Sequence, residues 1–466
     1  MRRLLLFLCL LPVFATAQIP LFETYFGSAM PEYARSVKQM PDSFVYMAGY
    51  VNELSLAHTN VVLYKLDARG NVRWQKTYGD TLDDNGLCLE KTRDGNFLLG
   101  GEKQTPSNLN DGILYKIDTS GNVLWYKTYG GPQYESFNRV AELPDGKLVL
   151  VGTQTDAGGW NGIYVMVTDS AGNMIWTGNY GGSDNDIGHS LCVLPDSGFV
   201  VFGDTRRAGG DYNVEGIRFT KNGTVLWDST YTYNDTVADG CQGATLLSDG
   251  NILIFGESVA YAGSWFDFLV QKIDVNGNTI WWKKVGGSNP DAAFSMIEVP
   301  GGFLGTGYSM SYSSGPNNII VFKTDTAGNL LWANPYGGPN IDIGYEIIPA
   351  LGGGYYVGAT ANVSGDDQFG LLHVDEGGWA GMQEEDADGN VRLYPNPNNG
   401  NFTVLLPPNN CSSVVEIVSA AGSLVFSEEI AAVTTQLSLQ EKLSPGMYFL
   451  RVISGKNVTV KKLVVD

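Results

Sequence analysis

Seven carboxylates recur at nearly equal spacing along the chain, and carboxylates are side chains that can bind a cation or transfer a proton. Each follows a large aromatic residue by ten positions, or by twelve in one longer copy. They are Glu32, Asp84, Glu135, Asp186, Asp239, Asp291 and Asp342. Each could accept backbone N–H groups of its own turn. Alternatively, together they could form a negatively charged ring that binds a cation such as Ca²⁺. Equivalent positions do not supply the unequal environments that a glycosidase acid–base pair requires.

An active site is expected to break such a repeat, because a reaction needs side chains with different roles. The residues that break it on the expected inner strands are Arg139, Tyr345 and Glu346, and His189 lies near the start of another inner strand. If these residues and an acid lie within hydrogen-bond distance of one another, an enzyme is favoured. If the structure instead shows only a regular ring of equivalent residues, a binding or structural module is favoured.

Two residues after each acid the side chain is small in six of the seven copies. These positions are Ala34, Gly86, Gly188, Cys241, Ala293 and Gly344, with Phe137 as the exception. Small residues suit a crowded centre, so the sequence predicts no roomy pocket there.

Other residues with chemical potential are scattered. Trp160 and Trp265 occur in loops of only two copies and could stack on a sugar ring or pack within their loops. His58, His189 and His373 lie in separate repeats without the spacing of a zinc site. A serine-nucleophile elbow and a phosphate-binding glycine loop are both absent from the sequence.

The aromatic residue before each acid defines the element that must position these groups. The anchors are Phe22, Trp74, Trp125, Trp176, Trp227, Trp281 and Trp332. Successive anchors are 52, 51, 51, 51, 54 and 51 residues apart. A period of this length, made of short apolar runs and glycine turns, is typical of a β-propeller. We therefore predict an all-β fold with seven four-stranded blades, in which each anchor fills the gap between neighbouring blades.

The third copy illustrates the predicted blade, with strands at residues 136–143, 147–153, 163–168 and 174–180. The chain opens with a lone outer-type strand at 19–26, and the last set of three strands, 343–375, lacks one. We expect the N-terminal strand to pair beside residues 371–374 and close the ring, because closure removes exposed sheet edges. The predicted propeller spans residues 18–380.

The turn before each anchor has a recognisable form, Asp118-x-x-Gly121-x-x-x-Trp125 in the second copy. It resembles the Trp-docking repeat of quinoprotein-type propellers, with one residue fewer between Asp and Trp. This resemblance implies a propeller fold. The adjacent-cysteine disulfide and the haem-attachment motif of those enzymes are absent. No cofactor is therefore expected, with Ca²⁺ at the acidic ring as the alternative.

Composition and the N-terminus indicate an exported protein. The formal net charge of −20 disfavours nucleic-acid binding, which needs a basic surface. Residues 1–17 form a predicted signal peptide, with Arg2 and Arg3 before an apolar run and Ala15-Thr16-Ala17 as the cleavage site. No other segment is long and apolar enough to span a bilayer. The remaining cysteines, Cys88, Cys192, Cys241 and Cys411, indicate buried thiols rather than a disulfide framework.

Beyond residue 380 the sequence changes character. Residues 381–390 form an acidic linker; they resemble the start of a calcium loop, but Pro395 occupies the position of its final acid. Residues 391–466 contain six short segments of alternating hydrophobicity, at 401–405, 414–419, 424–428, 436–439, 447–453 and 458–465. These predict a small immunoglobulin-like β-sandwich.

This last region resembles the C-terminal sorting domain of type IX secretion cargo from Bacteroidetes-type bacteria. The residues that carry the resemblance are Tyr394, Pro395, Asn396, Pro397, Gly446, Tyr448, Lys461 and Lys462. The resemblance implies export to the cell surface or the surroundings, with the type IX machinery as partner.

The sequence therefore favours an exported propeller that acts as a binding or structural module for an extracellular glycan or protein. The alternative is a secreted enzyme, either polysaccharide-acting or a quinoprotein-like oxidoreductase, with an asymmetric site on one propeller face.

Overall fold

The computed structural model describes most of two compact units, residues 1–380 and 381–466. In the first unit it describes residues 21–380 except 29, 54–57, 108, 182–184, 207–209, 234–237, 260–264, 313–315, 364 and 379. In the second it describes 392–394, 400–405, 413–419, 424–430, 434–439, 442–444, 446–454 and 457–465. Every regular element in these ranges is a β-strand or an isolated bridge. The predicted signal peptide, the acidic linker, Cys411 and Pro395–Pro397 of the sorting motif lie outside the described residues.

The first unit consists of repeated four-stranded antiparallel sheets, as expected for a propeller, and seven of them occur in its described part. The first sheet contains β2 (Glu32–Gln39), β3 (Val45–Asn52), β4 (Thr59–Leu66) and β5 (Val72–Tyr78), and the second contains β6 (Asp84–Lys91), β7 (Phe97–Gln104), β8 (Asn110–Ile117) and β9 (Val123–Tyr129). The third sheet contains β10 (Glu135–Glu142), β11 (Leu148–Thr155), β12 (Asn161–Thr168) and β13 (Met174–Tyr180), and the fourth contains β14 (Ile187–Val193), β15 (Phe199–Arg206), β16 (Tyr212–Phe219) and β17 (Val225–Tyr231). The fifth sheet contains β18 (Asp239–Leu246), β19 (Ile252–Val259), β20 (Phe266–Ile273) and β21 (Thr279–Val285), and the sixth contains β22 (Asp291–Val299), β23 (Gly302–Ser309), β24 (Asn318–Thr324) and β25 (Leu330–Tyr336).

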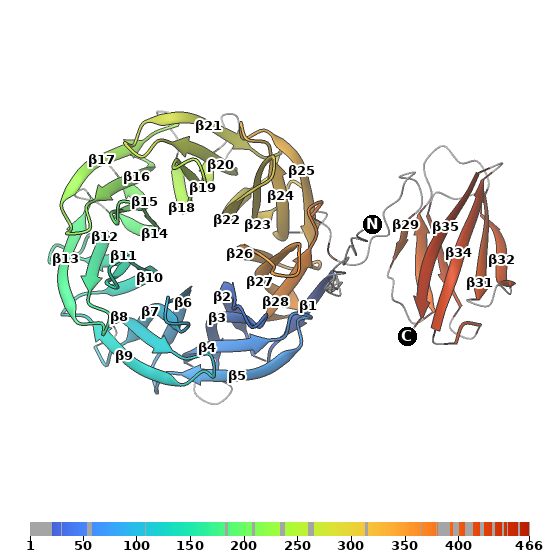
Figure 1. Cartoon of the computed structure of the whole chain (residues 1–466), viewed down its shortest axis with the longest axis horizontal. Coiled ribbons are helices and arrows are strands. Elements are labelled where there is room, and N and C mark those ends of the chain that lie inside the picture. The colour runs from blue at the N-terminus through green and yellow to red at the C-terminus, as the bar shows by residue number, and fades with distance from the viewer. Residues whose placement is uncertain are drawn as a thin grey trace, which may run out of the picture. The chain divides into compact units, whose positions relative to one another are not determined.

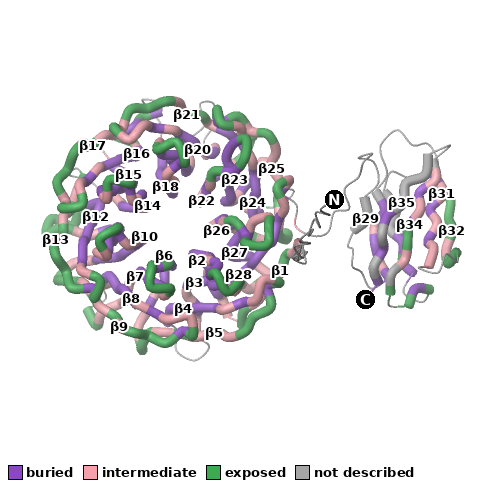
Figure 2. Tube along the Cα trace, in the orientation of Figure 1, coloured by how far each residue is buried: buried purple, intermediate pink, exposed green. Residues whose placement is uncertain are grey.

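The seventh sheet joins the two ends of this unit. It contains β26 (Asp342–Pro349), β27 (Tyr355–Val363), β28 (Asp366–Val374) and β1 (Phe22–Phe26). β1 pairs antiparallel with β28, from Phe22 opposite His373 to Phe26 opposite Phe369. Figure 1 shows the sheets around a common centre, with β2, β6, β10, β14, β18, β22 and β26 innermost. Buried residues follow the inner strands, and exposed residues follow the outer strands (Figure 2).

The anchors contact the turn of the neighbouring sheet. A Cβ atom added to Gly121, which has φ of +75°, would lie 2.9 Å from Cη2 of Trp74, so only glycine admits the ring at this distance. The hydroxyl of Tyr78 donates to the Gly121 carbonyl at 2.9 Å. The same relation recurs for Phe22–Gly70, Trp74–Gly121, Trp125–Gly172, Trp176–Gly223, Trp227–Gly277, Trp281–Gly328 and Trp332–Gly378. Each sheet is thus packed on the next through one aromatic ring and one glycine.

The aspartate of the repeated turn holds the turn together. In the second sheet, Oδ1 of Asp118 accepts hydrogen bonds from the backbone N–H groups of Ser120 and Asn122, both at 2.8 Å. The third-copy strands observed here differ from the predicted ones by at most two residues at either end. The spacing of Asp, Gly and Trp therefore corresponds to a hairpin that presents its glycine to the preceding sheet.

The second unit contains two sheets over one core. A three-stranded sheet is formed by β29 (Arg392–Tyr394), β30 (Asn401–Leu405) and β33 (Thr434–Ser438). A four-stranded sheet is formed by β32 (Leu424–Ile430), β31 (Ser413–Ser419), β34 (Gly446–Ser454) and β35 (Asn457–Val465). Phe402 of the first sheet and Ile417 and Leu450 of the second belong to one buried cluster. All six predicted segments are strands, with ends displaced by at most two residues.

Candidate functional site

Each innermost strand of the first unit carries a β-bulge at the same place. In β2, Ala34 pairs with Gly49 and Ser36 with Ala48, so the residue between them is left out of the ladder. The equivalent register shift occurs in β6, β10, β14, β18, β22 and β26. The seven bulged residues are Arg35, Leu87, Asn138, His189, Gln242, Phe294 and Tyr345. A bulge re-aims a side chain, which is why bulges are frequent next to functional sites.

A glycine on the second strand makes room for most of these bulges. A Cβ atom on Gly49 would lie 1.8 Å from the carbonyl oxygen of Tyr33. Glycine occupies the matching position in six of the seven sheets, with Ala359 in the seventh. The local sequence thus fixes the bulge through the close approach of two backbones.

The bulged side chains line one cavity of about 240 Å³, together with Arg139. Every innermost strand contributes to its wall, so this cavity, called the axial cavity below, lies at the common centre of the sheets. All eight lining residues are half-buried. Because the seven equivalent positions hold seven different residue types, the cavity is asymmetric although the sheets repeat.

One side of the cavity is aromatic and cationic. The guanidinium of Arg35 lies 4.6 Å from the centroid of the Tyr345 ring and 5.5 Å from that of Tyr50. Its Nη2 donates to the Tyr50 hydroxyl at 3.0 Å, while its buried Nε has no hydrogen-bond partner. The ring centroids of Phe294 and Tyr345 are 5.5 Å apart. This side offers ring surfaces and a cation together.

The opposite side carries histidine and acids. Nε2 of His189 lies 3.0 Å from Oδ2 of Asp204, whose Oδ1 accepts a hydrogen bond from the Cys241 backbone N–H at 2.7 Å. Glu257 lies close to this pair. Burial, with an added contribution from the negative charge of Asp204, raises the pKa of Glu257 to about 7.

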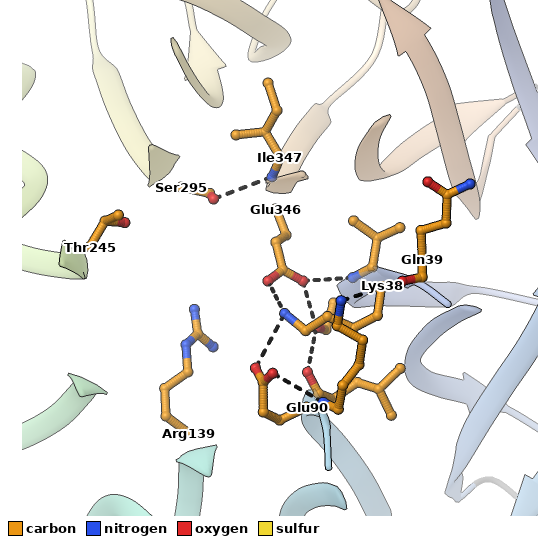
Figure 3. Close-up of polar contacts among 12 residues, drawn as sticks. Lys38, Gln39, Glu90, Arg139, Thr245, Ser295, Glu346 and Ile347 are labelled. Carbon is orange, nitrogen blue, oxygen red and sulfur yellow. Dashed lines mark hydrogen bonds and ion pairs between the residues drawn. The ribbon is translucent and has the colours of Figure 1, made fainter. Parts of the chain in front are cut away.

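A charged network occupies the inner strands near Arg139 (Figure 3). Glu346 accepts hydrogen bonds from Ser36 Oγ at 2.6 Å and from the Val37 N–H at 2.7 Å, and it also pairs with Lys38. Nζ of Lys38 lies 3.5 Å from Oε2 of Glu90. Burial alone would raise the pKa of Glu346, but the Lys38 charge and these hydrogen bonds hold it below its usual value.

Of the four residues singled out for breaking the repeat, Arg139, His189 and Tyr345 line the cavity. Glu346 is instead bound to Lys38 and Ser36. The acid that contacts His189 is Asp204 rather than Glu346.

Four of the seven repeated carboxylates accept a hydrogen bond from a backbone N–H of their own turn. Oδ2 of Asp342 accepts from the Gly338 N–H at 2.7 Å, and its Oδ1 accepts from the Asn362 N–H at 2.8 Å. Glu32, Asp84 and Asp291 likewise accept from the N–H four residues earlier, at 2.7, 2.9 and 3.0 Å. These contacts are those of the turn-capping interpretation.

The other three repeated acids have comparable partners. Asp186 accepts from the Arg206 N–H at 2.8 Å, Asp239 accepts from Ser258 Oγ, and Glu135 accepts from Gln154 Nε2 at 3.1 Å. All seven are buried, and burial raises the pKa of Asp84, Glu135, Asp239 and Asp342. In the part of the chain that the structure describes, no cluster of three or more His, Cys, Asp or Glu could hold a metal ion.

The remaining sequence candidates lie elsewhere. His58 is buried, and the ring of buried His373 lies 4.8 Å from that of Tyr356. Trp160 and Trp265 are 45% and 51% exposed. Cys88, Cys192 and Cys241 are buried free thiols.

Sequence reasoning missed most of the cavity. Arg35, Leu87, Asn138, Gln242 and Phe294 line it but were not singled out. The prediction of no roomy pocket assumed that the small residue before each bulge faces the centre of the first unit. Those residues are buried in the sheet, and the next side chain borders the cavity. The signal that could have found it is the recurrent glycine in the middle of the second strand.

A larger groove of about 650 Å³ lies between the fifth and sixth sheets, lined in part by Asp249, Lys272 and Glu298. Its charged groups already have partners. Lys272 pairs with Asp249 at 2.6 Å, and Glu298 accepts from the Ser248 N–H at 2.7 Å. The groove therefore offers a ligand fewer unpaired charged groups than the axial cavity does.

Comparison with known proteins identifies the C-terminal region. Residues 392–466 match the family model of the secretion system C-terminal sorting domain. The chain has no match among curated proteins.

Several solved structures are similar at low identity. One is PorZ, an essential bacterial surface component of the type IX secretion system of Porphyromonas gingivalis (14% identity, 92% of this chain and 59% of PorZ covered, TM-score 0.42). Another is a protein of unknown function from Dyadobacter fermentans (13% identity, 77% and 98% covered, TM-score 0.45). A third is a puromycin hydrolase (12% identity, 82% and 59% covered, TM-score 0.46). The chain thus spans 59% of the length of PorZ.

The sorting domain implies an exported protein, at the cell surface or secreted, that interacts with the type IX secretion machinery. Among the described residues, no helix is long and apolar enough to cross a membrane.

Proposed function

We propose that residues 21–380 form a closed seven-bladed propeller that binds a small molecule in its axial cavity, and that an immunoglobulin-like sorting domain directs its export. The pairing of β1 with β28 supports closure. So do the anchor–glycine contacts, which lead from each sheet to the next and include Phe22–Gly70 and Trp332–Gly378 at the ends.

The non-repeating composition of the cavity wall carries the binding proposal. A ring that served only as a scaffold would have no need of Arg, Leu, Asn, His, Gln, Phe and Tyr at seven equivalent positions. A concave site that combines apolar rings with a few converging polar groups is the usual form of a ligand site. At about 240 Å³ the cavity is smaller than most pockets for drug-sized ligands, so it suits a small molecule or the end of a glycan or peptide.

A ligand screen on the exported protein tests this proposal. Ligand-detected NMR with monosaccharides, organic acids and amino acids should find binders that the Tyr345→Ala variant loses. Leu331→Ala is the matched control, because Leu331 is 55% exposed on an outer strand. Ligands that bind Tyr345→Ala as well as the parent would refute an axial site, as would a screen without any binder.

The export role has its own test. A chain that ends before residue 392 should remain inside the cell envelope, whereas the full chain reaches the surface or the medium. Cell fractionation with an antibody against the propeller measures this. Equal export of both chains would show that the domain is not the signal.

A second candidate function is polysaccharide hydrolysis by general acid–base catalysis. Glu257, with its pKa of about 7, could transfer a proton near neutral pH, and it lies beside His189, which contacts Asp204. In that case His189→Gln should abolish turnover of a bound glycan while leaving its affinity within a few-fold. Unchanged turnover, or none in the parent chain, would exclude this candidate.

A further inference from the structure

The axial cavity is lined by two arginine side chains that make no ion pair with a carboxylate of the described residues, although the charge of Arg139 acts on Glu346. Arg35 contacts Tyr50 and Tyr345 and leaves its buried Nε without a hydrogen bond. Arg139 donates from Nη1 to the Asn138 carbonyl at 3.0 Å, and no carboxylate of the described residues lies within ion-pair distance of it. Arg139 extends from β10 into the space inside the ring (Figure 3).

Several other cations of this unit have acidic partners. Lys38, on the same inner surface, lies between Glu346 and Glu90. In the fourth sheet, Arg218 pairs with Asp196 at 2.7 Å. Acids outnumber Lys and Arg by 49 to 29 in this chain, so carboxylates are not scarce. Two guanidinium groups left without them at one cavity are therefore groups that a ligand can use.

We propose that the cavity binds a carboxylate attached to a six-membered ring, and that Arg35 and Arg139 hold the carboxylate. A guanidinium binds a carboxylate through paired, charge-assisted N–H···O bonds, which are among the strongest hydrogen bonds that a protein makes. Such an anion would bind two half-buried guanidinium groups that make no ion pair with a carboxylate of the described residues. This proposal rests on the proposed function and deepens it.

The remaining wall fits the ring that carries the carboxylate. Tyr345 and Phe294 present ring surfaces, and Leu87 adds an apolar contact. Gln242 also lines the cavity, and its side-chain amide can bind a hydroxyl group. The volume of about 240 Å³ restricts the bound part to about one ring. A hexuronic acid and an aromatic carboxylic acid share this chemistry.

Isothermal titration of the full exported chain with four probes tests the proposal. Glucuronate and benzoate carry the carboxylate on the two kinds of ring, and glucose and benzyl alcohol are their neutral counterparts. We expect at least one carboxylate to bind at least tenfold more tightly than its counterpart, and more weakly as NaCl increases. The tighter carboxylate identifies the kind of ring.

Substitutions locate the contact. Arg35→Gln and Arg139→Gln should each weaken carboxylate binding at least tenfold and leave neutral probes unaffected, while Arg35→Lys should give an intermediate loss. Arg206→Gln is the matched control, because Arg206 also stacks on a tyrosine, Tyr212, but does not line the cavity. Melting temperatures of all variants identify any that fail to fold.

Three results would overturn the proposal that the cavity binds a carboxylate. Neutral probes that bind as tightly as their acids would refute it while leaving the binding function intact. Retained carboxylate binding in both folded Gln variants would place the anion elsewhere. A failure of all four probes would also reject it, and the Tyr345→Ala screen would then decide the binding function separately.

Discussion

Replacing Glu257 with glutamine should make the first unit more stable at high pH and change its stability little at low pH. Glu257 is on β19 opposite Gly240, and burial together with the Asp204 charge raises its pKa from 4.5 to about 7. Between these values the folded state retains a proton that the unfolded state has lost. Stability therefore falls as pH rises through this window, by about 1.4 kcal/mol per pH unit. Above pH 7 the free energy of unfolding is lower by the full amount, on the order of 3 kcal/mol, and below pH 4.5 it is not lowered at all.

Urea unfolding followed by tryptophan fluorescence measures this difference, because all ten tryptophans lie in residues 1–380. We expect Glu257→Gln to match the parent at pH 4 and to exceed it by up to about 3 kcal/mol at pH 8. Glu102→Gln is the matched comparison at the equivalent position of the second sheet. Its carboxylate accepts hydrogen bonds from Asn85 and Tyr134, so this variant should lose stability at pH 8. A difference between Glu257→Gln and the parent that does not change with pH would refute the reasoning.

Four further perturbations test the architecture. Gly223 and Gly250 have positive φ angles of +85° and +83°, so Gly223→Ala and Gly250→Ala should each lower the free energy of unfolding by about 1–2 kcal/mol. Gly223→Ala should lower it by ~1–3 kcal/mol more, because its Cβ would lie 2.5 Å from the ring of Trp176. Equal losses in urea unfolding would contradict the anchor contact. Glu346→Gln should lower the free energy of unfolding by about 2 kcal/mol in the same assay, because Lys38 keeps only its longer contact with Glu90. An unchanged urea midpoint would show that the Lys38–Glu346 ion pair does not stabilise the fold. Deleting Phe22–Phe26 should lower the melting temperature and produce oligomers in size-exclusion chromatography, since β28 becomes an open edge; a stable monomer would argue against closure. EDTA should leave the melting temperature unchanged, because the repeated acids bind backbone N–H groups, and a drop reversed by Ca²⁺ would restore the cation interpretation.

The sequence was informative wherever a residue type is dictated by its local geometry. The Asp118, Gly121 and Trp125 spacing identifies a hairpin whose glycine must admit a ring, and its recurrence gives the strand order of each sheet. The same holds in the second unit, where alternating hydrophobicity locates all six predicted strands.

The cavity could not be predicted in the same way, because it depends on register across strands. A bulge adds one residue to a strand without changing its composition, so Arg35 between Ala34 and Ser36 reads as an ordinary strand residue. The partners of the functional side chains come from other strands: Asp204 reaches His189 from β15, and Lys38 reaches Glu346 from the neighbouring sheet. Only the folded chain brings them together.

The bulges also separate recognition from folding. A bulged residue takes no part in the ladder, and its side chain borders the cavity rather than the packed space between sheets. Substitution at one of these positions can therefore change the cavity wall while its six counterparts keep their places. Selection could then adapt such a protein to a new extracellular compound one residue at a time, and variation among its descendants should concentrate at these seven points of the chain.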